Sequence, residues 1–135
     1  LQRQAEGVPG VELVRHVSDM VLEMRSARAS LSQCGYNTAL DLVISGVPAL
    51  VVPYQTVTEN EQSQRAERLA ALGAMLQLDA DTLRPDTLAV AIGRLLAFKP
   101  LSAALALNGA ERSASILAQL QAQQHQNQEA PCLTA

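Results

Sequence analysis

Gly35, Thr38 and Asp41 follow one another at intervals of three residues in the stretch LSQCGYNTALD, which spans residues 31–41. The stretch predicts the end of a buried strand, a turn and the start of a helix. A helix that begins just beyond a strand presents unpaired N–H groups and a partial positive charge, which suit a phosphate or another anion. Gly35 lets the backbone turn tightly or lie flat against a ligand. Asp41, about one turn into the helix, can accept hydrogen bonds from ligand hydroxyls.

The composition limits the classes of protein that can hold such a site. The chain has 135 residues, 48% of them hydrophobic, which predicts one domain with a core. Two Tyr, one Phe and no Trp make that core aliphatic. A net charge of −3 without a basic patch argues against a nucleic-acid partner. No apolar run approaches the ~20 residues of a transmembrane segment, and the amino end lacks a signal-peptide pattern.

Two cysteines, Cys34 and Cys132, stand far apart in the chain. They do not form a disulfide framework, and reduced thiols in a cytoplasmic protein are the simplest interpretation. No CxxC or HExxH motif is present, so we predict no metal site and no cofactor.

The chain alternates short apolar segments with helical patterns between a polar lead-in, 1–10, and a Gln-rich tail, 121–135, expected to be a frayed helix end or disordered. We predict strands at 11–15, 29–32, 48–53 and 74–78. The helices start at Ser18, at Asn37 or Thr38, at a capping box formed by Thr58 and Glu61, at Pro85, and at a second box formed by Asn108 and Glu111. Gly46 and Gly73 end the second and third helices. The inward positions include Met20, Leu22, Leu69, Leu72, Ile92 and Leu96.

This order predicts an α/β fold, a three-layer Rossmann-like domain over 11–120 with a short parallel sheet flanked by helices. Ligands of such sheets bind outside the carboxyl ends of the strands. Residues 16–17, 32–37 and 54–62 are therefore expected on one rim of the sheet.

Three blocks of the sequence then resemble a known family: SQCGYNTALDL at 32–42, GVPALVVP at 46–53, and NEQ at 60–62 followed by Ala66 and Gly73. Together they look like the C-terminal domain of GT-B glycosyltransferases, in the family that includes the peptidoglycan N-acetylglucosaminyltransferase (glycosyltransferase family 28). The similarity runs from about Val11 to Phe98. It implies that the chain is a partial GT-B C-terminal domain that binds a nucleoside-diphosphate sugar, usually UDP-linked, whose hexose is moved to an acceptor.

The resemblance also implies roles for single residues. The backbone at Val17 would meet the base, and Ser32, Gly35 and Thr38 would line the phosphates and ribose. Asp41 stands where the family places a ribose-binding Glu, and Glu61 and Gln62 occupy the donor-sugar positions. Cys34 and Tyr36 depart from the family, which has small residues there more often.

The chain is much shorter than a two-domain enzyme of this kind. We therefore expect a fragment that lacks the acceptor domain, the general base and a glycine-rich diphosphate loop, and that neither catalyses transfer nor binds donor tightly alone. Apolar surface exposed by truncation would favour self-association. In the implied reaction the nucleoside diphosphate is displaced from the anomeric carbon of the sugar, and helix N–H groups stabilise the charge that develops on this leaving group without an obligatory metal.

Two alternatives remain at this point. Cys34 near a helix N-terminus could serve as a nucleophile with His16 as its base, although the G-x-[S/C]-x-G turn is absent. The chain could instead be a non-catalytic, Rossmann-like interaction module.

Overall fold

The computed structural model describes residue 5, residues 7–101 and residues 107–129. The chain divides into two compact units, 1–103 and 104–135. The first unit contains, in order, α2 (Met20–Ser26), β1 (Ser30–Ser32), α3 (Tyr36–Ser45), β2 (Ala49–Val51), α4 (Glu61–Ala71), β3 (Leu76–Gln77), a 3-10 turn η1 (Ala80–Thr82) and α5 (Pro85–Ala97). The second unit contains α6 (Gly109–Glu129). We expected this helix to belong to the main domain, which was predicted to end at residue 120, but α6 belongs to the second unit. It also extends into the Gln-rich segment, to Glu129.

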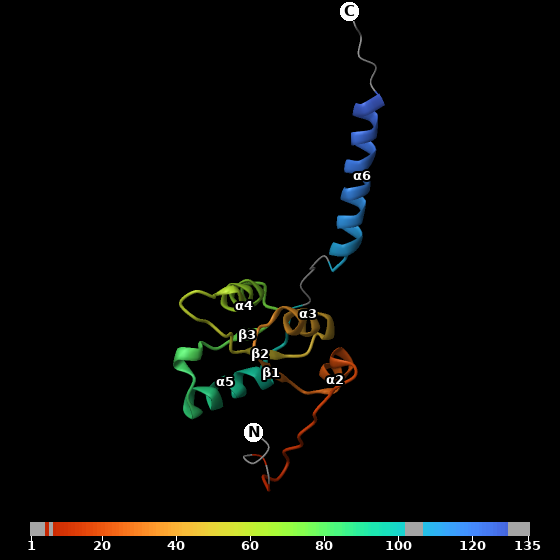
Figure 1. Ribbon diagram of the computed structural model, residues 1–135. Helices are drawn as coiled ribbons and strands as arrows, with labels where there is room; N and C mark the ends of the chain where they lie inside the picture. The colour runs from red at the N-terminus through yellow and green to blue at the C-terminus, as the bar shows by residue number, and fades with distance from the viewer. Residues whose placement is uncertain (1–4, 6, 102–106, 130–135) are drawn as a thin grey trace, which may run out of the picture. The chain divides into compact units, whose positions relative to one another are not determined.

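The sheet of the first unit has three parallel strands in the order β1-β2-β3. In Figure 1, α3 and α4 lie on one face of the sheet and α5 lies on the other, which confirms the predicted α/β fold class. Each crossover helix joins two neighbouring parallel strands, as the alternating sequence pattern requires.

The strand predicted at 11–15 does not form. Its apolar side chains are exposed, with Val11 at 50%, Leu13 at 53% and Val14 at 64%. A strand is stabilised by the ladder and the side-chain contacts that a neighbour supplies. Among the described strands β1 pairs with β2 alone, so the segment 11–15 has neither of these.

Strand β2 is the centre of the core, and all three of its residues are buried. Around it lie the other buried apolar side chains, which are mostly aliphatic as expected: Met24, Cys34, Ala39, Leu42, Val47, Ala66 and Met75. Central position explains the continuous apolar run, because both faces of β2 are covered.

Three helix starts differ from the predicted ones. The carboxylate of Asp19, not the hydroxyl of Ser18, caps α2 by accepting from Leu22 N at 2.9 Å. Helix α3 begins at Tyr36, one to two residues before the predicted Asn37 or Thr38 cap, with Gly35 as an N-cap that has no side chain. Helix α4 has Asn60 as its N-cap, so the box of Thr58 and Glu61 does not form.

Other helix ends are as predicted. Pro85 is the first residue of α5, where its missing N–H costs nothing. Gly46 follows α3 with φ +69° and Gly73 follows α4 with φ +70°, the left-handed conformation that favours glycine.

Several side chains predicted to face inward are exposed: Met20 (44%), Leu22 (64%), Leu72 (49%), Ile92 (37%) and Leu96 (48%). Helical spacing identified an apolar stripe wider than the surface that the three-stranded sheet offers for burial. Each helix therefore buries the middle of its stripe, as α5 does with Leu95, and leaves the margins exposed.

Candidate functional site

The carboxyl ends of the three strands form one rim, because all strands run in the same direction. The register aligns Ser32 with Val51, and Val51 with Gln77. Two further bonds close the ladder at this rim: Val52 N donates to Ser32 O, and Leu78 N donates to Val51 O, each at 2.9 Å. The segments 33–35 and 52–60 leave this rim side by side and lead into α3 and α4.

The N-terminus of α3 lacks the capping side chain and the acidic residue that usually compensate the unpaired N–H groups and the partial positive charge of a helix start. Its N-cap, Gly35, makes no side-chain hydrogen bond, and its first turn has no acidic residue. The first intrahelical bond runs from Ala39 N to Gly35 O at 2.9 Å. The N–H groups of residues 36–38 therefore precede the helix ladder and remain available to an anion.

Gly35 does not serve the turn, contrary to one of the two roles expected for it. Its φ of −60° and ψ of 159° are open to any residue. A Cβ built on Gly35 meets only the hydroxyl of Thr38, at an ordinary 3.9 Å. Neither the backbone angles nor the protein contacts require glycine here, and the missing side chain leaves space beside the start of α3.

Gln62 and Arg65 of α4 reach across the rim to the loop before α3. Gln62 Oε1 accepts from Cys34 N at 3.1 Å and from Tyr54 N at 3.2 Å. Arg65 donates from Nη1 to Cys34 O at 2.8 Å, and its guanidinium lies 5.6 Å from the centre of the Tyr36 ring. The structure thus brings Gln62 beside Gly35, and it adds a positive charge that the sequence did not identify.

The loop between β2 and α4 is anchored by a hydrogen bond to α4 and by others within the loop. Ser63, a buried polar residue, donates to Gln55 Oε1 at 2.7 Å. A turn is closed by Thr56, whose N–H donates to Glu59 O at 2.9 Å and whose hydroxyl accepts from Glu59 N at 3.0 Å.

Glu61 takes no part in capping, and its side chain, 80% exposed, lies 4.0 Å from Arg65. Its carboxylate is available to a ligand.

The remaining predicted contacts on α3 and β1 lie at or near this rim. Thr38 is in the first turn of α3 and Asp41 is in the second, and both are half-buried. Asp41 forms no ion pair with any residue that the structure describes. The hydroxyl of Ser32 is buried and has no hydrogen-bond partner within the described part of the chain.

Val17 is not tied to this cluster. It lies in the segment before α2 and is half-buried, and His16 beside it is exposed. No hydrogen bond or ion pair among the described residues joins either of them to α3 or α4. The structure therefore joins the loop before α3, with the proposed phosphate positions, to Gln62 of the proposed sugar positions, while the contacts proposed for Asp41 and for the base stay predictions.

The thiol-enzyme alternative is disfavoured by the environment of Cys34. Its side chain is completely buried. Burial raises the pKa of the Cys34 thiol, and the nearby Arg65 guanidinium offsets this only in part. A nucleophilic cysteine needs an accessible thiolate, so Cys34 acts as a small core residue, and Cys132 lies outside the described residues.

We expect Cys34 to make the protein less stable at alkaline pH. Because its pKa in the folded state is raised from the ordinary value of 9.0, the unfolded chain releases the thiol proton first. The stabilising contribution is complete below about pH 8.5 and is lost as the pH rises toward the folded-state pKa, by up to about 1.4 kcal/mol per pH unit. Urea unfolding of wild type and Cys34→Ala between pH 7 and 10 measures this, and parallel curves would contradict it.

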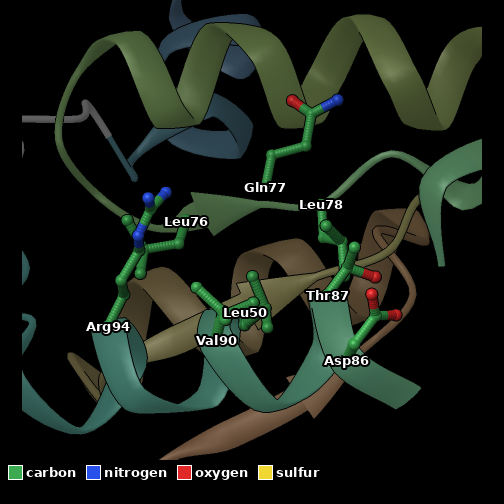
Figure 2. Close-up of a pocket in the computed structure, with 9 residues that line it drawn as sticks. Leu50, Leu76, Gln77, Leu78, Asp86, Thr87, Val90 and Arg94 are labelled. Atoms are coloured by element: carbon green, nitrogen blue, oxygen red, sulfur yellow. The ribbon is translucent and has the colours of Figure 1, made fainter. Parts of the chain in front are cut away.

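A cavity of about 370 Å³ lies on the other face of the sheet, beneath α5. Its lining is mostly apolar: Leu50, Leu76, Leu78, Val90 and Ala91, with Gln77, Asp86, Thr87 and Arg94. Figure 2 shows the side chains of Val90 and Arg94 on α5 facing this space, while the Gln77 side chain points to the opposite face of the sheet. The Thr87 hydroxyl is occupied by hydrogen bonds to Arg84 and Thr82. The lining is mostly apolar, and the rim, where polar side chains and an uncapped helix N-terminus converge, is the better candidate site.

Comparison with known proteins identifies the family to which this arrangement belongs. The family model described as "Glycosyltransferase family 28 C-terminal domain" matches residues 1–128. The chain belongs to this family. The resemblance inferred from residues 32–42, 46–53 and 60–62 is thereby confirmed.

Relatives of this family 28 domain are longer transferases. The UDP-N-acetylglucosamine--N-acetylmuramyl-(pentapeptide) pyrophosphoryl-undecaprenol N-acetylglucosamine transferase of Mesorhizobium japonicum is 34% identical over 86 residues, 64% of this chain and 23% of that protein. The transferase of the same name from Methylorubrum extorquens (strain PA1) is 30% identical over 123 residues, 85% of this chain and 33% of that protein. The chain thus spans a third or less of these relatives.

Solved structures agree with the fold of the family 28 domain. Acinetobacter baumannii MurG matches with a TM-score of 0.61 at 22% identity, over 70% of this chain and 28% of that chain. The glycotransferase of kitacinnamycin matches with a TM-score of 0.55 at 28% identity, over 65% of this chain and 22% of that chain.

No helix within the described ranges is both long and apolar enough to cross a membrane. Sequence reasoning missed Arg65, whose guanidinium contacts Cys34 O and the Tyr36 ring at the start of α3. The spacing could have found it, since Gln62 and Arg65 stand at i and i+3 and therefore share one face of α4.

Proposed function

We propose that this family 28 domain is the donor-binding part of a glycosyltransferase that moves a hexose-type sugar from a nucleoside diphosphate, UDP being the expected carrier, to an acceptor. The observation that carries the proposal is the uncapped N-terminus of α3 at the carboxyl rim of a parallel sheet. Open space at Gly35 and the Arg65 guanidinium beside it add room and charge for a diphosphate.

Other groups at the rim fit the rest of such a donor. Asp41 can accept from the two ribose hydroxyls, and Glu61 can accept from sugar hydroxyls. The buried Ser32 hydroxyl, unpartnered within the described residues, can donate to a phosphate oxygen. The names of the relatives, which include UDP-N-acetylglucosamine, support a UDP-linked donor.

In the reaction, an acceptor oxygen forms a bond to the anomeric carbon while the bond from that carbon to the diphosphate breaks. Negative charge develops on the departing diphosphate. The N–H groups of residues 36–38 and the positive end of α3 stabilise that charge, and they do so without rearrangement because the helix is already formed. The base and the acceptor site belong to the part of the protein outside this domain. A cytoplasmic location completes the proposal, in keeping with the free thiol of Cys34.

Calorimetry on the full-length protein tests the proposal. UDP should bind at least about tenfold more tightly than UMP, because its second phosphate adds a charged hydrogen bond worth about 1.5–3 kcal/mol. ADP and GDP serve as controls for the base. Equal affinities for UDP and UMP would contradict a diphosphate site at α3.

We expect this 135-residue chain on its own to self-associate through the edge of β1. Leu31 is 50% exposed there and lies in one register row with Leu50 and Leu76. Sedimentation velocity should show concentration-dependent association that Leu31→Lys abolishes, since a charge on an edge strand opposes pairing. Leu72→Lys, at a similarly exposed position on α4, is the control and should leave association unchanged. A monomer at all concentrations would contradict this expectation.

A further inference from the structure

The peptide groups on both sides of Cys34 are held by one turn of α4. Cys34 N donates to Gln62 Oε1 at 3.1 Å, and Cys34 O accepts from Arg65 at 2.8 Å. Gln62 and Arg65 are three positions apart, so they project from the same face of the helix. The loop that immediately precedes α3 is therefore fixed to α4 rather than to its own helix.

The same Gln62 oxygen also holds the second rim loop. Tyr54 N, just after β2, donates to Gln62 Oε1 at 3.2 Å. An amide oxygen has two lone pairs, and here both are used by backbone N–H groups from different loops. The oxygen is thus saturated by protein donors, and only the Gln62 NH₂ remains free for other partners.

We propose that Gln62 is a positioning residue of the donor site: its side-chain oxygen joins the β1–α3 and β2–α4 loops and thereby sets the position of the α3 N-terminus. This inference rests on the proposed function and alters the role that the family resemblance implied for Gln62. Its oxygen acts on the nucleoside diphosphate through the loops, so removal of that oxygen weakens binding even of a nucleoside diphosphate that carries no hexose.

Three variants of the full-length protein test the inference. Gln62→Met keeps the length of the side chain and removes the acceptor. Gln62→Glu keeps an acceptor for both N–H groups. Gln64→Met is the control, because Gln64 is an exposed residue of the same helix whose side chain, among the described residues, bonds only to Asn60, at 3.1 Å.

Hydrogen–deuterium exchange of the amides of Cys34 and Tyr54 reports on the loops without any nucleotide. Both should exchange about threefold to tenfold faster in Gln62→Met, the range for one lost hydrogen bond. Gln62→Glu should restore the wild-type rates, and Gln64→Met should not change them. Unchanged rates in Gln62→Met would overturn the proposal.

Calorimetry with UDP and with UDP-N-acetylglucosamine separates positioning from direct contact. Gln62→Met should weaken both ligands by the same factor, about threefold to tenfold. A loss confined to UDP-N-acetylglucosamine would overturn the proposal and make Gln62 a direct sugar contact. If wild type binds neither ligand, the proposed function and the donor role of Gln62 fail together, while the exchange rates still decide whether the oxygen joins the loops.

Discussion

Gly35→Ser is expected to stabilise the fold and to weaken nucleoside diphosphate binding. Serine is a preferred N-cap, and the φ and ψ of Gly35 suit it without strain. Capping and a less flexible unfolded chain should together raise the free energy of unfolding by about 0.5–1 kcal/mol. The new hydroxyl occupies an N–H group that the diphosphate would otherwise use, so affinity for UDP should fall at least about tenfold. Urea unfolding and calorimetry measure the two effects.

Gly46→Ser, at the other end of the same helix, is the matched control. Gly46 has φ +69° and no atoms within 4 Å of an added Cβ, so the cost is one of backbone strain, about 1–2 kcal/mol. Its position far from the rim should leave UDP affinity unchanged. The two substitutions should thus change the free energy of unfolding in opposite directions, and only Gly35→Ser should lower UDP affinity. If Gly35→Ser binds UDP with the same affinity as wild type, the proposed anion site at the α3 N-terminus is wrong.

Asp41→Asn is expected to weaken UDP binding by about 10- to 150-fold, the equivalent of one charged hydrogen bond of about 1.5–3 kcal/mol. Stability should change by less than about 0.5 kcal/mol, because Asp41 is half-buried and makes no ion pair with the described residues. The measurement is calorimetry with UDP and with 2′,3′-dideoxy-UDP, which lacks both ribose hydroxyls.

The deoxy ligand and a conservative variant make the ribose assignment specific. Wild type should bind dideoxy-UDP about as weakly as Asp41→Asn binds UDP. Asp41→Asn should lower the affinity for dideoxy-UDP little further, because the hydroxyls that Asp41 would bind are already absent. Asp41→Glu restores the carboxylate and should recover most of the affinity. Glu67→Gln, an exposed carboxylate of α4, controls for charge alone. Equal UDP affinities of wild type and Asp41→Asn would disprove the assignment.

The elements around the rim could be predicted from the sequence because their signals are local. The run ALVVP marks the buried strand β2, and Gly46 and Gly73 mark helix ends through the left-handed conformation that they adopt. The segment 11–15 shows the limit of such patterns. Its composition suits a strand, but a strand also needs a neighbour, and no local signal states whether one is present.

The candidate site divides in the same way. Gly35, Thr38 and Asp41 could be assigned because a strand-to-helix turn and a family resemblance both identify them. The hydrogen bonds of Gln62 and Arg65 to Cys34 could not be predicted. Each joins residues that are far apart in the sequence, by 28 and by 31 positions, and depends on how α4 packs. The capping box of Thr58 and Glu61 failed for a related reason: hydrogen bonds within the loop, such as that between Thr56 and Glu59, satisfied the backbone first.

The order of strands and helices along the chain determines the order in which the candidate site can be assembled as the chain leaves the ribosome. Pairing of β1 with β2 joins Ser30 to Ala49 across α3, and it can be completed before α4 has been synthesised. The residues of the α3 N-terminus are thus synthesised before Gln62 and Arg65, which hold the loop in front of it. A nascent chain halted ahead of α4 would contain all of β1, α3 and β2 but neither Gln62 nor Arg65, so the loop before α3 can be fixed in place only once α4 has been synthesised.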